Sequence, residues 1–143
     1  MRLYLKICTA IFIVCMVHIF VCGAGLAADE PANYVQAYYF HATFRCKKCT
    51  TLEQYSREAI ETNFKEQLGN RTLRFNEINF DEPENRHFLQ DFNLTYRALV
   101  LVRYKDGKQA EFKNLVKVWQ LVGNKDAFLE YVKEETEAYL KDL

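Results

Sequence analysis

The segment that decides the fold runs from Tyr34 to Cys49 and reads YVQAYYFHATFRCKKC. Its first part, Tyr34 to Phe40, is an apolar run of aromatic and β-branched residues, which is typical of a buried β-strand. A brief connection through residues 41–45 leads to two cysteines that are separated by two residues. From Cys49 to Leu68 apolar residues recur every three to five positions, which predicts a helix. The segment therefore predicts a strand that passes into a helix at a CxxC pair.

Two further strands and a hairpin are predicted after this helix. Residues 73–79 alternate apolar and polar side chains, which predicts a second strand. A short helix is expected over residues 81–92, because Pro83 and acidic residues stand at its start. The apolar run 98–104 predicts a third strand, and the Asp-Gly pair after it predicts a hairpin that returns through residues 109–112.

The chain ends in helical patterns. Residues 115–121 predict a short helical turn, and Asn124 is a suitable N-cap for a last helix over residues 125–141. The predicted order is β-α-β-α-β-β-α. We read it as two parallel βαβ crossovers followed by a hairpin and a closing helix, which makes an α/β three-layer sandwich over residues 34–143. A CxxC pair beside a βαβ pattern is the thioredoxin-like signature.

Composition allows one compact domain and excludes one class of partner. The chain has 143 residues, of which 50 % are hydrophobic. Lys plus Arg equal Asp plus Glu at 19 each, so the formal net charge is zero. Proteins that bind nucleic acid carry a concentrated basic face, so we expect no nucleic-acid partner.

The first 28 residues form a different kind of sequence. Arg2 and Lys6 precede an apolar run from Ile7 to Ala28 that contains no Asp, Glu, Lys or Arg. A basic start, an apolar stretch and small residues at its end are typical of an export signal, but this run approaches the ~20 residues that cross a bilayer. Three alternatives stay open: a cleaved signal peptide, a retained membrane anchor, or lipidation at Cys22.

All three alternatives predict the same compartment for the domain. The positive flank stays inside, so the domain is expected outside the cytosol, in the periplasm or another extracytoplasmic space. Contact with a membrane would be made through residues 7–28, and the polar residues 29–33 form a spacer before the domain.

The cysteines fall into two groups. Those of the export segment are interpreted as small apolar residues, and they stand at positions 8, 15 and 22. The domain contains only Cys46 and Cys49, which cannot make the framework of a multi-bridge disulfide scaffold. They do not complete a zinc site either, because His41 and His87 lie at no fitting spacing. A redox pair with no metal and no cofactor is the interpretation that remains.

Residues 33–143 resemble the thioredoxin superfamily. YYFHATFRCKKC at residues 38–49, FKNL at 112–115 and WQLV at 119–122 resemble more closely a small family of exported proteins, the nitrophenyl compound nitroreductase subunits of the arsenic-operon type. The resemblance implies a thioredoxin-like fold. A nitroreductase activity would need a partner subunit or dithiol chemistry alone, because the chain has no Gly-x-Gly-x-x-Gly motif.

The sequence departs from thioredoxin at three places. Arg45 stands where thioredoxin has Trp, and Lys47 and Lys48 replace Gly-Pro between the cysteines. Phe40 occupies the position of thioredoxin's buried acid. The region that carries a cis-proline in thioredoxins reads Thr-Tyr-Arg-Ala at residues 95–98. A cis peptide bond without Pro costs ~3–4 kcal/mol, so we expect a trans loop.

The resemblance implies roles for the two cysteines. Cys46 would attack the disulfide of a protein partner and Cys49 would resolve the mixed disulfide, and outside the cytosol a reductase would also need a membrane thiol donor. A loop this short stabilises little through chain entropy, which argues against a purely structural disulfide. The alternatives are a non-catalytic accessory subunit on this fold and a protein that binds soft metals or arsenite at the two thiols.

Neighbouring polar residues are expected to tune Cys46. Arg45, Lys47 and Lys48 surround the pair with positive charge in the sequence, which would lower the pKa of the Cys46 thiol and make the couple more oxidising. His41 has two interpretations: it assists proton transfer, or it is an ordinary polar residue at a strand end.

Overall fold

The computed structural model describes residues 31–143. The predictions about the export segment and its three cysteines lie outside the described residues. Within residues 31–143 no helix is long and apolar enough to cross a membrane.

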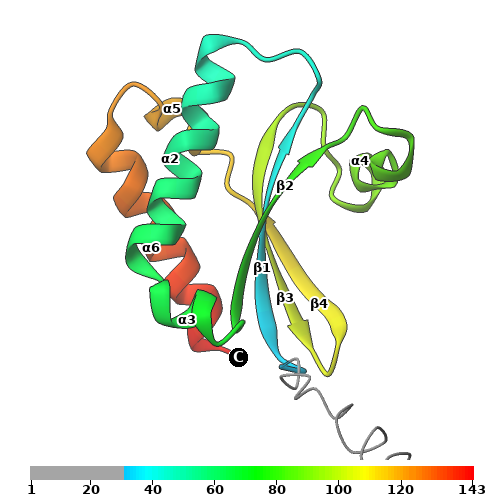
Figure 1. Ribbon diagram of the computed structural model, residues 1–143, viewed down its shortest axis with the longest axis vertical. Helices are drawn as coiled ribbons and strands as arrows, with labels where there is room; N and C mark the ends of the chain where they lie inside the picture. Colours follow the sequence, from blue (N-terminus) through cyan, green and yellow to red (C-terminus); the bar gives the residue numbers. More distant parts are fainter. Residues whose placement is uncertain (1–30) are drawn as a thin grey trace, which may run out of the picture.

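The secondary structure follows the predicted order (Figure 1). The elements are β1 (Tyr34–His41), α2 (Lys47–Asn63), α3 (Lys65–Gly69), β2 (Leu73–Asn79), the 3-10 helix η1 (Pro83–Asn85), α4 (His87–Asp91), β3 (Ala98–Lys105), β4 (Lys108–Asn114), α5 (Val118–Leu121) and α6 (Lys125–Lys141). The predicted helix over residues 49–68 is divided into α2 and α3. The division falls at Phe64, which leaves helical geometry at φ −125° and ψ 38° and places its ring in the core.

The sheet has the strand order β2-β1-β3-β4. β1 pairs in parallel with β2 and antiparallel with β3, and β3 pairs antiparallel with β4. The prediction of a second parallel crossover was therefore wrong. A helix that returns along a strand must match its length, but the five residues of α4 rise only about 7.5 Å, whereas the eight residues of β3 span about 26 Å. The chain consequently enters β3 at the end where it left β2.

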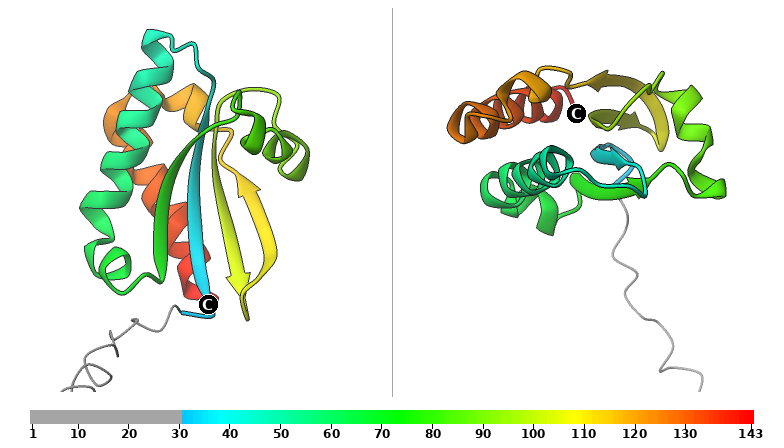
Figure 2. Two further views of the ribbon diagram at one scale, coloured as in Figure 1. Left: turned by 45° about the vertical axis from the view of Figure 1, so that its right-hand side comes forward. Right: turned by 90° about the horizontal axis from the view of Figure 1, so that it is seen from above.

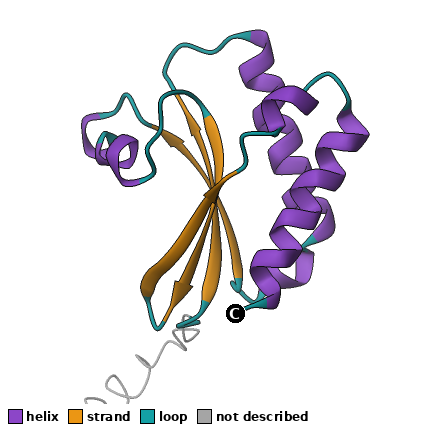
Figure 3. Cartoon of the chain, turned by 180° about the vertical axis from the view of Figure 1, so that it is seen from behind, coloured by secondary structure: helices purple, strands orange, loops and turns teal. Residues whose placement is uncertain are grey.

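Helices lie on both faces of the sheet. α2, α3, α5 and α6 cover one face, and η1 with α4 lies against part of the other (Figures 1 and 2). Because side chains alternate along a strand, Tyr39 joins the core under α2 and α6, whereas Phe40 joins an aromatic cluster with Phe88 and Phe92 on the α4 side. Figure 3 shows the same layers from behind. The described residues thus form a mixed α/β fold, with a four-stranded sheet between two helical layers.

Two local predictions are confirmed by backbone geometry. Asp106 and Gly107 both have positive φ, at 51° and 71°, which is the turn geometry that joins β3 to β4. Asn124 caps α6, because its side-chain oxygen accepts a hydrogen bond from the Ala127 N–H at 3.2 Å. The hairpin and the last helix therefore begin where the sequence placed them.

Candidate active site

The CxxC pair lies where β1 passes into α2. Cys46 is the N-cap of α2, with φ −85° and ψ 162°, and its sulfur accepts a hydrogen bond from the Cys49 N–H at 3.2 Å. One helical turn brings the two residues to a Cα–Cα distance of 5.0 Å, and they form a disulfide. The chain is therefore described in its oxidised form.

The two sulfur-bearing residues differ in exposure. Cys49 is buried, with 2 % of its surface exposed, whereas Cys46 is half-buried. Cys46 also stands at the end of α2 where backbone N–H groups are unpaired and the helix dipole is positive, and the first turn contains no acidic residue to offset this. The geometry therefore favours a thiolate at Cys46 and hides Cys49 from a partner.

Tyr39 lies directly beneath Cys49. Its buried hydroxyl donates a hydrogen bond to the Cys49 carbonyl oxygen at 2.8 Å. Burial raises the pKa of Tyr39 to about 12, although the positive charges of Arg45 and Arg97 act in the opposite direction. The hydroxyl consequently stays protonated near neutral pH and acts as a fixed donor. Sequence reasoning missed this residue; the alternation along β1 was the signal, because Tyr39 faces α2 while Phe40 faces away.

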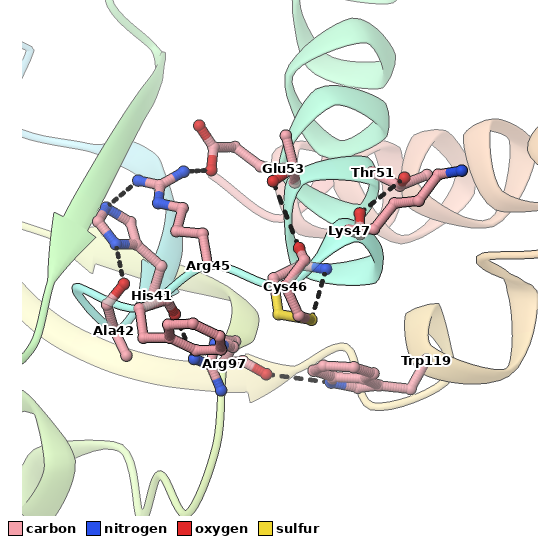
Figure 4. Close-up of a disulfide and its surroundings, with 12 residues drawn as sticks. His41, Ala42, Arg45, Cys46, Lys47, Thr51, Glu53, Arg97 and Trp119 are labelled. Carbon is pink, nitrogen blue, oxygen red and sulfur yellow. Dashed lines mark hydrogen bonds and ion pairs between the residues drawn. A yellow bond between two sulfur atoms is a disulfide. The ribbon is translucent and has the colours of Figure 1, made fainter.

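Arg45 and His41 contact each other beside the disulfide (Figure 4). The Arg45 guanidinium forms an ion pair with Glu53 and donates to Nε2 of His41 at 2.6 Å, while Nδ1 of His41 lies 3.0 Å from the Ala42 carbonyl oxygen. Because arginine only donates, Nε2 accepts and the His41 proton resides on Nδ1. Both ring nitrogens are thus occupied, and the Arg45 charge is turned toward Glu53.

The two lysines between the cysteines lie on the outer side of the helix start. Lys47 and Lys48 are exposed, and the Lys47 side chain extends away from the disulfide (Figure 4). Among residues 31–143 neither lysine has a carboxylate at ion-pair distance. Their charge therefore reaches the dithiol mainly through solvent.

The loop before β3 is hydrogen-bonded to the segment that precedes Cys46. Arg97 donates from its guanidinium to the Phe44 carbonyl oxygen at 2.5 Å, and its own carbonyl oxygen accepts from the Trp119 indole N–H at 3.0 Å (Figure 4). These bonds join the loops before α2 and β3 to helix α5. Residues 31–143 contain no cis peptide bond, which confirms the trans loop expected at residues 95–98.

These same segments carry apolar side chains, several of which are exposed. Phe44 is 77 % exposed although it stands two residues before Cys46. Tyr96 is exposed and packs edge-on against Trp119, with 5.7 Å between ring centroids, and the two line a shallow hollow of about 400 Å³. Phe44, Tyr96 and Trp119 therefore form an apolar rim on the segments next to the CxxC pair, which the Arg97 hydrogen bonds hold together. No group of three or more His, Cys, Asp or Glu within the described residues is arranged to hold a metal ion.

Comparisons with known proteins concern the fold. No family model matches the sequence, and no curated protein matches it. Among solved structures, the chain is similar to mitochondrial thioredoxin 3 from Saccharomyces cerevisiae, with 17 % identity over 75 % of this chain and 82 % of that one, at a TM-score of 0.40. It is also similar to Fasciola hepatica thioredoxin, with 20 % identity over 64 % and 81 % of the two chains, at a TM-score of 0.39.

A two-domain structure is similar as well. It contains the first two thioredoxin domains of Naumovozyma dairenensis Eps1p, with 16 % identity over 74 % of this chain and a TM-score of 0.45. The match covers 36 % of that longer chain. At such identities these likenesses transfer no residue's role to this protein, and the site rests on its own geometry.

Proposed function

We propose that this protein is an exported thiol–disulfide oxidoreductase in which Cys46 exchanges with the partner and Cys49 resolves. The observation that carries the proposal is the asymmetry of the disulfide: Cys46 is half-buried at a helix N-terminus, whereas Cys49 is 2 % exposed. A sulfur of a partner protein can reach Cys46, whereas the buried Cys49 can react only with the sulfur of Cys46. This division of roles is what dithiol exchange needs.

The reaction balances without a cofactor. The Cys46 thiolate attacks one sulfur of a partner disulfide, a mixed disulfide forms, and the other partner sulfur leaves as a thiolate that takes up a proton. The Cys49 thiolate then attacks the Cys46 sulfur and releases the second partner thiol. The partner gains two electrons and the Cys46–Cys49 disulfide forms, which is the form described in the structure. In the reverse direction a partner thiolate attacks Cys46.

A polypeptide is the partner that suits the surroundings. The rim of Phe44, Tyr96 and Trp119 on the segments next to the CxxC pair offers apolar contact, which a small hydrophilic thiol would not use. The sequence of residues 1–28 supports a location outside the cytosol, where a membrane thiol donor or an electron acceptor would complete the cycle. The link to the nitroreductase-subunit family stays a prediction from resemblance.

Trapping in the native host tests the proposal. In the Cys49→Ser variant the mixed disulfide cannot be resolved, so we expect a covalent complex between Cys46 and a host protein that reductant releases. The Cys46→Ser variant is the matched control and should trap nothing. If Cys49→Ser forms no such complex and the parent protein does not exchange disulfides with insulin, the oxidoreductase proposal is wrong.

A further inference from the structure

The cationic side chains around the dithiol are not equivalent. Arg45 lies beside the disulfide, but Glu53 pairs with its guanidinium. A contacting pair of opposite charges exerts little net field beyond its own dimensions. Arg45 therefore contributes less positive charge at Cys46 than its position in the sequence indicates.

The electrostatic effect of the lysine pair on the dithiol is reduced for a different reason. Lys47 and Lys48 are exposed, and water with physiological salt screens exposed charges over about 8 Å. The Lys47 side chain also extends away from the sulfurs (Figure 4). Any effect of these lysines on the dithiol should consequently decline as salt is added.

Arg97 differs from the other cations in both respects. Among residues 31–143 no carboxylate lies at ion-pair distance from its guanidinium, and its Nε is buried without a hydrogen-bond partner in this structure. Its terminal nitrogen contacts the Phe44 carbonyl oxygen, two residues before Cys46. Like Arg45, whose effect on this group is larger, Arg97 lowers the pKa of the Tyr39 hydroxyl, the group that contacts the Cys49 carbonyl oxygen. A half-buried positive charge that has no carboxylate partner among residues 31–143 thus lies near the dithiol (Figure 4).

We infer that Arg97 stabilises the Cys46 thiolate and so helps to set the reactivity of this thiol. A stabilised thiolate favours the reduced form and makes the couple more oxidising. Arg97 is a positioning residue, because it acts on the sulfur through its field and through the Phe44 carbonyl. The inference rests on the proposed function for its use, but the thiolate can be measured without any partner.

The test measures the ionisation of Cys46 in the full chain. In a Cys49→Ser background the alkylation of Cys46 by iodoacetamide is followed across pH by mass spectrometry of its peptide, so that the thiols at positions 8, 15 and 22 are counted separately. We expect Arg97→Gln to move the midpoint of the profile to higher pH. At a pH below both midpoints, a midpoint that is one pH unit higher should slow alkylation about threefold, because the smaller thiolate fraction is partly offset by greater nucleophilicity.

Two control variants separate charge from structure. Arg97→Lys keeps the charge and should restore most of the parent midpoint. Arg57→Gln removes an arginine on α2 that already pairs with Glu61 and Glu77, and should leave the midpoint unchanged. An unchanged midpoint in Arg97→Gln, equal changes in Arg97→Gln and Arg97→Lys, or a changed midpoint in Arg57→Gln would each overturn the inference.

Salt gives a measurement that needs no variant at position 97. A partly buried cation is screened less than an exposed one, so the midpoint of the parent protein should change little between low salt and 1 M salt. A midpoint that rises in 1 M salt to the ordinary value of a free cysteine would assign the effect to exposed charges such as Lys47 and Lys48. That result would overturn the inference even if Arg97→Gln did not fold.

Discussion

The Tyr39 hydroxyl donates a hydrogen bond to the Cys49 carbonyl oxygen at 2.8 Å, across the interface between β1 and the first turn of α2. Both groups are buried, so the bond is shielded from competing water. It holds the buried half of the disulfide against the sheet through a backbone atom, and neither sulfur takes part in it. We therefore expect this support to remain when the disulfide is reduced.

Removing this hydroxyl should cost stability. We expect Tyr39→Phe to lower the free energy of unfolding by about 1 kcal/mol, because the aromatic packing stays while one buried hydrogen bond is lost. Urea unfolding of the oxidised forms measures this difference. Tyr131→Phe is the control, since its hydroxyl has no hydrogen bond within residues 31–143, and its effect should be a few tenths of a kcal/mol. Equal effects in the two variants would contradict the role given to Tyr39.

The same tyrosine should make stability depend on alkaline pH. Burial raises the pKa of Tyr39 from 10.0 to about 12, so its stabilising contribution is complete below pH 10 and is lost as pH rises through 12. The parent protein should lose more stability than Tyr39→Phe between pH 10 and pH 12, and the two should run parallel between pH 7 and pH 9. The midpoints of urea unfolding across this pH range measure the difference between the two proteins. Parallel curves up to pH 12 would show that Tyr39 ionises as freely in the folded protein as in the unfolded chain.

Local patterns were enough for much of the fold. The strand before the CxxC pair, the Asp106-Gly107 turn and the Asn124 cap each follow from a few neighbouring residues. The direction of β3 does not follow from local patterns, because it depends on the length of α4. A pattern of apolar residues predicts a helix but not whether that helix is long enough to span the sheet. Phe64 divided a continuous helical pattern because its ring packs into the core.

The sequence predicted that the two cysteines form a pair, but it did not predict the contacts of the charged residues around them. Cys46 and Cys49 are local to one turn, so their pairing is readable from spacing. The partner of Arg45 is Glu53, two helical turns along α2, and Arg97 arrives from a loop more than fifty positions after Phe44 in the chain. The cysteine spacing therefore located the site, but the charges in the sequence did not show which of them are paired in the fold.

The lysine pair should tune the couple in a salt-dependent way. Replacing it with the thioredoxin dipeptide, Lys47→Gly/Lys48→Pro, should lower the reduction potential measured in glutathione buffers, because two positive charges near the thiolate are lost. Since both lysines are exposed, the difference from the parent should be largest at low salt and small at 1 M salt. An unchanged or higher potential in the double variant at low salt would exclude a tuning role for the pair.

The apolar rim should matter for protein partners and not for small ones. Phe44 and Tyr96 are exposed on the loops before α2 and β3, and a polypeptide seated there would bury their rings, each worth about 1.5–3 kcal/mol when fully covered. We expect Phe44→Ser and Tyr96→Ser to slow the reduction of insulin disulfides about tenfold, which corresponds to partial burial, while the reaction with oxidised glutathione stays unchanged. Leu143→Ser removes an exposed apolar residue at the chain end and is the control. If insulin and glutathione slow together, the rim supports the dithiol itself; if neither slows, the partner binds through other residues.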